Sequence, residues 1–315
     1  MADSRITRLA DGLVVQAGSG VFDVPADLGM IVCTIRGRSR LGRDASRSLR
    51  GLSDHALVPV VGDRTLVTIF DRETGVIEAI LPRHNRFSRK VAGRRHDERI
   101  IAANIDQVVV VFAAAEPSVR ETALTRYLAV AEHSGVPAVV CINKTDLVPR
   151  GSLEQVAGAY ESLGYAVILA STRTQKGIGE LTALLMNKIS VVVGPSGVGK
   201  SLLLNAVQPG LGLAVGDVSK STGKGKHTTT SSRLYPLDSG GFVADTAGMR
   251  EFGFWDIPED ELTWCFREMG PFLGRCRFAD CTHVTEPGCA IRGAVSEGAI
   301  SENRYRHCFR LRVEG

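Results

Sequence analysis

The chain has 315 residues, a formal net charge of +4, and 44% hydrophobic residues. This length exceeds one typical domain, so two or three domains are expected. No apolar run is long enough for a membrane helix, and the N-terminus lacks the charged-then-apolar pattern of a signal peptide. We therefore expect a cytoplasmic protein without a membrane partner.

The first part of the chain consists of short β-type runs separated by Gly, Asp and Pro turns. The runs are residues 5–17, 21–24, 29–35, 56–60, 64–70 and 75–81. Short strands at this spacing are typical of a small closed barrel, and the OB-fold is one such barrel. We therefore expect a small N-terminal β-barrel domain.

Arginines gather in two clusters in and just after this region. The clusters are Arg36, Arg38, Arg40, Arg43, Arg47 and Arg50, and then Arg83, Arg86, Arg89, Lys90, Arg94, Arg95 and Arg99. Arginine clusters often simply form a solvent-exposed surface without a binding role. Two such clusters around a β-rich domain, however, favour contacts with RNA phosphates. Aromatic residues are sparse here (Phe22, Phe70, Phe87), which favours backbone and shape recognition over base reading.

From residue 100 to 253 strands and helices alternate. The expected strands are 105–112, 138–142, 166–169, 189–193 and 242–244, with a helix over 121–134. This alternation predicts a three-layer α/β fold whose site lies at the carboxyl ends of the strands.

The strand at 138–142 is followed by Asn143-Lys144-Thr145-Asp146. The Asp146 carboxylate can accept two hydrogen bonds, from the N1–H and the exocyclic amine of guanine. Adenine offers no such donor pair, so ATP would leave the carboxylate unpaired. Asn143 can tether the loop, and the Lys144 stem can pack along the ring. Taken alone the motif is weak, because these residues are common in strand-to-helix turns.

A second loop of the same kind follows the next strand. Ala170-Ser171-Thr172 comes directly after residues 166–169, as in the short loop whose backbone N–H contacts the guanine oxygen. Two base-reading loops on successive strand ends indicate specificity for guanine.

A phosphate-binding loop follows the strand at 189–193. Its residues are Gly194, Pro195, Ser196, Gly197, Val198, Gly199, Lys200 and Ser201, and Leu202 continues into an apolar helix. The backbone N–H groups form an anion-binding nest at a helix N-terminus, Lys200 can reach the outer phosphates, and the Ser201 hydroxyl can bind Mg²⁺. A glycine-rich turn with an incidental lysine is the alternative. The strand before and the helix after favour a nucleoside triphosphate site.

Two later segments can respond to the γ-phosphate. Asp245 ends the strand 242–244 and can hold Mg²⁺ through water, while the Gly248 N–H can sense the phosphate. The polar stretch 216–232 offers a threonine to complete the Mg²⁺ shell; we favour Thr229, with Thr228 next. A solvated flexible loop is the alternative, and order–disorder change is how GTPase switches work.

The nucleotide elements occur in the order base loop, second base loop, phosphate loop, first switch and second switch. The first switch is the polar stretch 216–232, and the second is the segment that contains Asp245 and Gly248. Ras-like GTPases have the phosphate loop first, so this chain is circularly permuted. Permutation leaves the packing of a parallel sheet intact. The second switch then leads directly into whatever follows residue 250, which couples nucleotide state to the C-terminal part of the chain.

The C-terminal part contains Cys276, Cys281, His283 and Cys289, spaced Cys-x4-Cys-x-His-x5-Cys. Three thiolates and one imidazole are typical of tetrahedral structural Zn²⁺ with no open position. Scattered reduced cysteines are the alternative, but clustering within fourteen residues argues against it. A catalytic zinc needs a vacant position and a general base, and neither is evident.

Residues 256–270 and 301–312 are expected to be helices flanking this cluster. Leu262, Phe266 and Met269 would form the packing stripe of the first helix. The other cysteines are interpreted as buried or half-buried thiols: Cys33, Cys141, Cys265 and Cys308.

The permuted order, the Gly-Lys-Gly-Lys-His-Thr-Thr-Thr segment at 223–230 and the cysteine cluster together resemble the RsgA (YjeQ) family of ribosome-assembly GTPases, over nearly the whole chain. The resemblance implies a multidomain protein: an N-terminal OB-fold (1–90), a circularly permuted P-loop GTPase domain (91–254) and a zinc-binding α-helical domain (255–315). It also implies action late in maturation of the small ribosomal subunit. Ala247 departs from the family's usual proline; since Asp245 and Gly248 remain, we expect altered loop stiffness rather than lost function.

Hydrolysis needs a group to orient the attacking water. Met249 stands where Ras carries a glutamine, and a thioether cannot do this. The resemblance points to His227, whose neutral imidazole has a pKa near working pH. A polar residue that contacts RNA is the alternative interpretation of His227.

We therefore expect a GTPase (GTP to GDP and phosphate, EC 3.6.1.-) that uses GTP/GDP, Mg²⁺ and one structural Zn²⁺. Its expected partners are the small (30S) ribosomal subunit and its rRNA, and we expect a monomer. The alternatives are a nucleotide-gated RNA-binding module with incidental hydrolysis and a permuted GTPase serving another ribosome assembly step. A metabolic kinase is disfavoured, since no acceptor-substrate base is recognisable.

Overall fold

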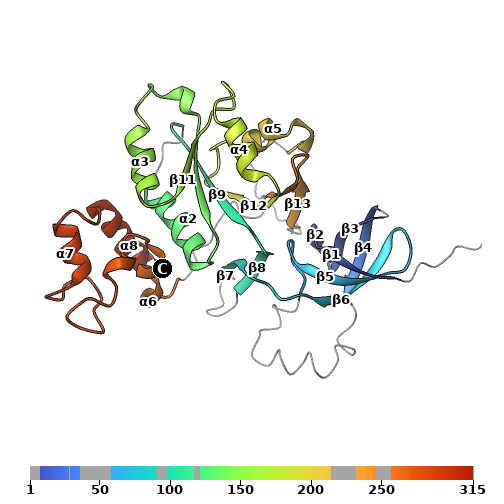
Figure 1. Ribbon diagram of the computed structural model, residues 1–315, viewed down its shortest axis with the longest axis horizontal. Coiled ribbons are helices and arrows are strands. Elements are labelled where there is room, and N and C mark those ends of the chain that lie inside the picture. The colour runs from blue at the N-terminus through green and yellow to red at the C-terminus, as the bar shows by residue number, and fades with distance from the viewer. Residues whose placement is uncertain are drawn as a thin grey trace, which may run out of the picture. The chain divides into compact units, whose positions relative to one another are not determined.

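The computed structural model describes residues 8–27, 29–35, 58–90, 98–116, 121–213, 232–245 and 257–314 (Figure 1). The chain divides into two compact units that are interleaved in sequence. The first unit comprises Met1–Asp106, Leu184–Val192 and Val218–Gly253, and the second comprises Gln107–Ala183, Val193–Asp217 and Phe254–Gly315. Among the described residues, every helix is too short or too polar to span a bilayer.

The first unit begins with a run of short strands. They are β1 (Arg8–Leu13), β2 (Gln16–Gly18), β3 (Val21–Ala26), β4 (Gly29–Ile35), β5 (Arg64–Ile69) and β6 (Thr74–Ile80). They pair in the order β1-β5-β6-β4-β3-β2, antiparallel except for the parallel pair β4 and β6. β1 also contacts β3, so the sheet curls over its own core.

Alternation of apolar and polar residues directs one face of this curled sheet inward, since successive side chains of a strand point to opposite faces. In β3 the buried residues are Phe22 and Val24, and in β4 they are Ile31 and Cys33. The whole core cluster consists of Val14, Phe22, Val24, Ile31, Cys33, Val67, Ile69 and Ile77. Cys33 is thus a buried thiol, as the sequence predicted, and burial raises its pKa to about 11.

Two of the expected strands differ in the structure. The run 5–17 is divided, within its described part, because Val14 bonds to Asp63 while Val15 bonds to Asp23, which moves the chain from one neighbour to another. The run 56–60 forms no strand over its described residues 58–60. There the Asp63 side chain accepts from the Val60 N–H at 2.8 Å and holds the chain in a turn.

The turn at Gly62 and a hairpin after β6 complete this region. Gly62 has φ +87°, and a Cβ there would lie 2.0 Å from the Ala103 carbonyl oxygen, so only glycine is tolerated. The hairpin is formed by β7 (Arg86–Lys90) and β8 (Glu98–Ala103), which the sequence interpretation missed. Arg83 forms a bidentate ion pair with the fully buried Asp63, at 2.6 and 2.7 Å.

Three further strands belong to the first unit. They are β12 (Lys188–Val193), β13 (Ser232–Pro236) and β14 (Gly241–Asp245). β14 pairs in parallel with β12 and antiparallel with β13, and β13 pairs antiparallel with β2. The expected strands at 189–193 and 242–244 are confirmed, each slightly longer than predicted.

The second unit contains a parallel sheet of β9 (Gln107–Ala113), β10 (Ala138–Asn143) and β11 (Ala166–Leu169). Every residue of β9 and β10 is buried, which explains their nearly continuous apolar sequences. The helices of this region are α2 (Glu121–His133), α3 (Glu154–Ser162), α4 (Ile178–Leu185) and α5 (Lys200–Val207). Figure 1 shows α2 and α3 on one side of the strands and α4 and α5 on the other, a layered α/β arrangement.

The C-terminal part of the second unit packs around a core to which α2 also contributes. Its elements are α6 (Glu259–Leu262), η6 (Thr263–Cys265), η7 (Gly270–Phe272), α7 (Ala290–Ser296) and α8 (Glu302–Glu314). The core cluster contains Leu262, Phe266 and Met269, the packing stripe predicted from sequence, with Cys265 and Cys308. Ala129 of α2 belongs to the same cluster, so this core is continuous with the α/β part.

The expected single helix over 256–270 is wrong. α6 ends at Leu262, and the chain continues in tight turns: the N–H groups of Phe266, Met269 and Phe272 each bond to the carbonyl three residues earlier. Such i→i+3 bonding gives about three residues per turn, so residues spaced by three still face one core. The predicted burial of these residues is therefore confirmed, although the predicted helix is wrong.

Candidate functional site

The phosphate loop lies between β12 and α5, and its glycines are required by geometry. Gly194 has φ +143°, and a Cβ there would lie 2.0 Å from the Val111 carbonyl oxygen. Gly199 has φ +91°, and a Cβ there would lie 2.5 Å from Nδ2 of Asn143. Both positions therefore exclude any side chain, and the loop backbone can approach an anion closely.

Lys200, the first residue of α5, folds over this loop. Its Nζ donates to the carbonyl oxygens of Gly194 and Pro195, each at 2.7 Å. The ammonium group is therefore held at the loop, next to the helix N-terminus where phosphate groups bind. Ser196 and Gly197 at the tip are exposed, whereas Val198 is buried and anchors the loop.

Asn143 joins the base loop to the phosphate loop. It ends β10, its side chain is 1% exposed, and its Nδ2 donates to the Val198 carbonyl at 2.9 Å. Its buried Oδ1 accepts from no described residue. The next residue, Lys144, adopts a left-handed conformation with φ +59°, and its Nζ donates to the Glu116 carbonyl. These contacts fix the shape of the loop that presents Asp146.

Asp146 is held by the second base loop. Its Oδ1 accepts from Ser171 Oγ at 2.6 Å, and Nη1 of Arg173 lies 3.7 Å from its Oδ2. The Ser171 hydroxyl is the main cause that lowers the pKa of Asp146, so the carboxyl is ionised. An ionised carboxylate with a fixed orientation is the acceptor that a guanine N1–H and amine require.

The fully buried Ser171 organises the second base loop. Its backbone N–H donates to the Lys176 carbonyl at 3.0 Å, and its hydroxyl accepts from the Thr174 N–H at 3.1 Å. The backbone N–H of Thr172 donates to no described residue, so it is available to a base oxygen. Sequence reasoning missed the bond from the Ser171 side chain to Asp146, although a hydroxyl at a strand end is a signal for it.

The remaining predicted nucleotide residues lie partly outside the described residues. Ser201 and Leu202 are in the first turn of α5, with Ser201 half-buried and Leu202 44% exposed. Asp245 ends β14, but its side chain is outside the described part of the chain. His227, Thr228, Thr229 and Gly248 also fall outside it.

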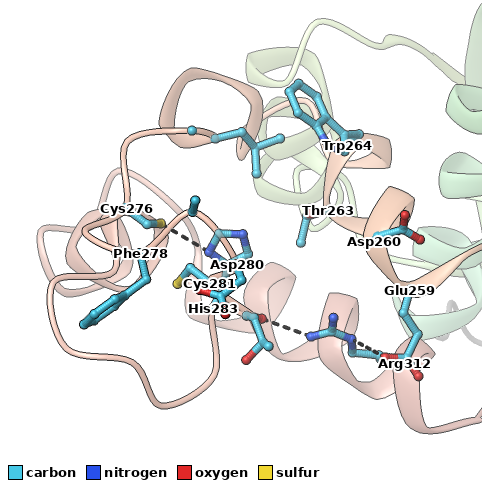
Figure 2. Close-up of a pocket in the computed structure, with 14 residues that line it drawn as sticks. Glu259, Asp260, Thr263, Trp264, Cys276, Phe278, Asp280, Cys281, His283 and Arg312 are labelled. Carbon is cyan, nitrogen blue, oxygen red and sulfur yellow. Dashed lines mark hydrogen bonds and ion pairs between the residues drawn. The ribbon is translucent and has the colours of Figure 1, made fainter.

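The cysteine cluster comes together in space, and Figure 2 shows three of its members, Cys276, Cys281 and His283. The ligand atoms of Cys276, Cys281, His283 and Cys289 all lie within 4.8 Å of one another. Nδ1 of His283 is 3.4 Å from the Cys276 sulfur and 3.5 Å from the Cys289 sulfur, and the two sulfurs are 3.9 Å apart. A tetrahedral zinc site requires about 3.5 Å between sulfur and nitrogen and about 3.8 Å between sulfurs. The donor set and its spacing fit a structural metal ion.

Backbone donors and helix caps support these ligands. The N–H of Ala290 lies 3.3 Å from the Cys276 sulfur, and that of Arg292 lies 3.5 Å from the Cys289 sulfur, which is the N-cap of α7. Hydrogen bonds of this kind favour thiolates over thiols. His283 has φ +66°, an uncommon backbone conformation for this residue, which turns its ring toward the sulfurs.

Two residues that sequence reasoning missed brace the same loop. The Glu286 carboxylate accepts from the backbone N–H groups of Thr282, Val284 and Thr285, and these bonds, led by the Thr282 hydroxyl, lower its pKa far below the usual range. The Tyr305 hydroxyl of α8 donates to the His283 carbonyl at 2.7 Å. The position of Glu286 between His283 and Cys289 in the sequence could have indicated that it braces this loop.

The C-terminal core is attached to α2 by paired charges. Nε of Arg304 lies 2.6 Å from Glu268, and its Nη1 donates to Thr125 of α2 at 3.1 Å. Arg267 bonds to Glu132 of α2 at 2.7 Å. These contacts join the C-terminal core to the helix that leads into the base-loop strand.

Comparison with known proteins agrees with these features. The sequence profile described as RsgA GTPase matches residues 80–255. The chain is 41% identical to the small ribosomal subunit biogenesis GTPase RsgA of Gemmatimonas aurantiaca, over 98% of each chain. It is 38% identical to the protein of the same name from Caldanaerobacter subterraneus subsp. tengcongensis, over 93% of this chain and 92% of that one.

Solved structures give the same result. The crystal structure of YjeQ from Thermotoga maritima superimposes with a TM-score of 0.77 at 34% identity and covers 98% of each chain. YloQ, described as a circularly permuted GTPase, gives a TM-score of 0.73 at 28% identity and covers 100% of this chain and 97% of that one. The permutation inferred from motif order is therefore shared with a solved relative. The chain belongs to the RsgA GTPase family.

Proposed function

We propose that this protein hydrolyses GTP in step with late maturation of the small ribosomal subunit and binds rRNA there. The observation that carries the proposal is the bond from Asn143 to Val198, which joins a guanine-type base loop to a phosphate loop in one site. The names of relatives at 38–41% identity over nearly the whole chain support the small subunit as partner. The site of action is then the cytoplasm, and the protein acts as a monomer.

The nucleotide contacts follow from the site geometry. Asp146 accepts from the base, the Thr172 N–H donates to its oxygen, and the phosphates lie on the loop backbone. The proposed set is Asn143, Lys144, Asp146, Ser171, Thr172, Gly194, Pro195, Ser196, Gly197, Val198, Gly199, Lys200, Ser201, Leu202, Thr228, Thr229, Asp245 and Gly248. Ser201 and Thr229 would hold Mg²⁺, which neutralises charge on the phosphates when bound. His227 is the proposed water-orienting residue.

The zinc proposal rests on the donor set. Cys276, Cys281, His283 and Cys289 would hold one Zn²⁺ with every position filled, so the ion stabilises the fold and takes no part in hydrolysis. The lack of a vacant position in this arrangement separates it from catalytic zinc sites.

The domain proposal assigns an OB-fold to residues 1–90, the permuted GTPase domain to 91–254 and the zinc domain to 255–315. The curled strand order of β1 to β6 and its single core cluster support the first of these. Basic residues of the first domain would contact rRNA phosphates; of the two arginine clusters, Arg36 to Arg50 lies outside the described residues.

The test is GTP turnover at fixed salt, alone and with purified small or large subunits. We expect stimulation of about tenfold or more by the small subunit only, which corresponds to about 1.4 kcal/mol off the barrier. His227→Ala should abolish the stimulated rate while GDP affinity stays near that of the native protein. Stimulation by the large subunit alone would assign the protein to another assembly step. If neither subunit changes the rate of GTP turnover, the protein is an RNA-binding module with incidental hydrolysis.

A further inference from the structure

A pocket lies beside the zinc-type cluster on the surface of the C-terminal part (Figure 2). Its volume is about 390 Å³, within the range of small-molecule and side-chain binding sites and far more than one metal ion needs. One wall comes from α6 and η6, and the other from the loop that carries Cys276 to His283. All of these residues belong to the second unit.

Three residues of the first wall lie on one face of the chain. Asp260, Thr263 and Trp264 are spaced i, i+3 and i+4, which places them side by side on a helical turn. Trp264 is 67% exposed, the largest exposed fraction among the large apolar side chains described. Its ring contacts no described aromatic or cationic group. The exposed indole ring is therefore available to stack on a ligand in the pocket.

Thr263 supplies an independent indication of a ligand. The residue is only 7% exposed, and its side chain points from η6 into the pocket (Figure 2). Its hydroxyl forms no hydrogen bond with any described residue. The hydroxyl is therefore available to hydrogen-bond a polar group of a ligand in the pocket.

The charge of the pocket selects the ligand class. Arg312 is paired with Glu259 at 3.1 Å and donates to the Thr282 carbonyl at 3.0 Å, so both members of that pair are satisfied. Asp260 and Asp280 also line the pocket, and neither has an ion-pair partner among the described residues. Two unpaired carboxylates next to an open indole favour a cation, since arginine stacks on tryptophan and pairs with carboxylates.

We propose that this pocket binds an arginine side chain of a basic polypeptide segment. The guanidinium would stack on Trp264 and donate to the Thr263 hydroxyl, and the negative charges of Asp260 and Asp280 on the pocket walls would favour the cation. Nucleic acid is disfavoured, because its phosphates would meet the two unpaired carboxylates. The partner is then a protein tail rather than RNA, and the pocket is separate from the nucleotide site.

The test uses the zinc-loaded full chain and a short fluorescent peptide of alternating arginine and glycine. Fluorescence anisotropy at fixed salt gives the dissociation constant. In a Trp255→Phe background Trp264 is the sole tryptophan, so its emission reports contact directly. We expect saturable binding with a change in Trp264 emission, and no change in that emission when a single-stranded RNA oligonucleotide is added in place of the peptide.

Matched variants separate the pocket from general charge. Asp260→Asn combined with Asp280→Asn should weaken peptide binding by about tenfold. Glu297→Gln combined with Glu302→Gln removes the same charge from the same domain outside the pocket and should leave binding unchanged. Thr263→Val and Trp264→Ser should each weaken binding while zinc content and GTP turnover without subunits stay the same. These two substitutions do not adjoin a cysteine ligand in sequence.

Three outcomes would overturn the proposal. Equal weakening by the pocket and control variants would show that only net charge matters. Binding that persists in both Thr263→Val and Trp264→Ser would place the peptide elsewhere. A change in Trp264 emission on adding the RNA oligonucleotide without peptide would make the pocket a base-stacking site for RNA.

Discussion

Nδ2 of Asn143 lies 2.9 Å from the carbonyl oxygen of Val198, a contact between residues 55 positions apart in sequence. One end of this bond belongs to the loop that would read the base, and the other to the loop that would hold the phosphates. Gly199 must lack a side chain for the same reason, because a Cβ there would lie 2.5 Å from this Nδ2. The two halves of the nucleotide site are therefore built as one structure.

Asn143→Ala should weaken binding of GDP and GTP together. The substitution leaves the Val198 carbonyl without its donor and should lower the free energy of unfolding by about 1–3 kcal/mol. Asn205→Ala is the control, since its amide on α5 bonds to the backbone of Leu213 beyond the end of that helix, and its loss should cost stability without changing nucleotide affinity. Titration with a fluorescent GDP analogue and urea denaturation measure both effects. Unchanged affinity in Asn143→Ala would contradict the coupling of the two loops.

The buried pair of Arg304 and Glu268 should contribute strongly to stability. Their side chains are 10% and 6% exposed, so Arg304→Met would leave a buried carboxylate unpaired, at a cost of about 3–5 kcal/mol. Arg306→Met, which breaks the exposed pair with Glu302, should cost at most about 1 kcal/mol. Urea denaturation of both variants measures the difference, and equal losses would contradict this account.

Much of the fold could be predicted from local patterns. The buried strands β9 and β10 and the phosphate loop appear as apolar runs and glycine spacing, which reflect constraints within a few residues. The four candidate metal ligands were found because their spacing is short. The residues Leu262, Phe266 and Met269 were correctly placed in a core, although the helix expected around them was wrong.

The rest depends on contacts that are distant in sequence. Arg304 meets Thr125 across 179 residues and Glu268 across 36, and neither pairing leaves a local pattern. The turn at Val60 is set by the side chain of Asp63, which competes with strand pairing in a way that β-propensity does not register. The role of Ser171 was missed for a similar reason, since its hydroxyl acts on Asp146, 25 residues earlier.

Tyr305→Phe should weaken zinc binding. The tyrosine hydroxyl donates to the His283 carbonyl and so holds the backbone of a residue with φ +66°. Loss of one such bond costs about 1 kcal/mol, or about fivefold in affinity. Competition with a chromogenic chelator gives the affinity. Phe309→Leu alters the neighbouring ring without removing this bond and should retain zinc more tightly than Tyr305→Phe. Native affinity in Tyr305→Phe would show that the bond does not support the site.

His307 should make stability depend on pH. Burial is the main cause that lowers its pKa, opposed by Glu121 and aided by Arg304 and Arg310. The unfolded chain therefore binds a proton at a higher pH than the folded one, and stability falls as the pH drops below about 6.5. His307→Gln should lose less stability than the native protein between about pH 7 and pH 5. Parallel pH profiles of urea midpoints for the two proteins would contradict this assignment.

The most direct test of the guanine site and its link to the ribosome is a change of base specificity at Asp146. Asp146→Asn replaces an acceptor with an amide, which no longer suits the guanine N1–H and amine but can donate to the carbonyl of xanthine. Turnover of GTP and of xanthosine triphosphate should be measured for this variant with small subunits present. We predict that the variant hydrolyses xanthosine triphosphate with stimulation by the small subunit and has lost most GTP turnover. Retention of native GTP turnover by Asp146→Asn would contradict the assignment of this loop as the base site.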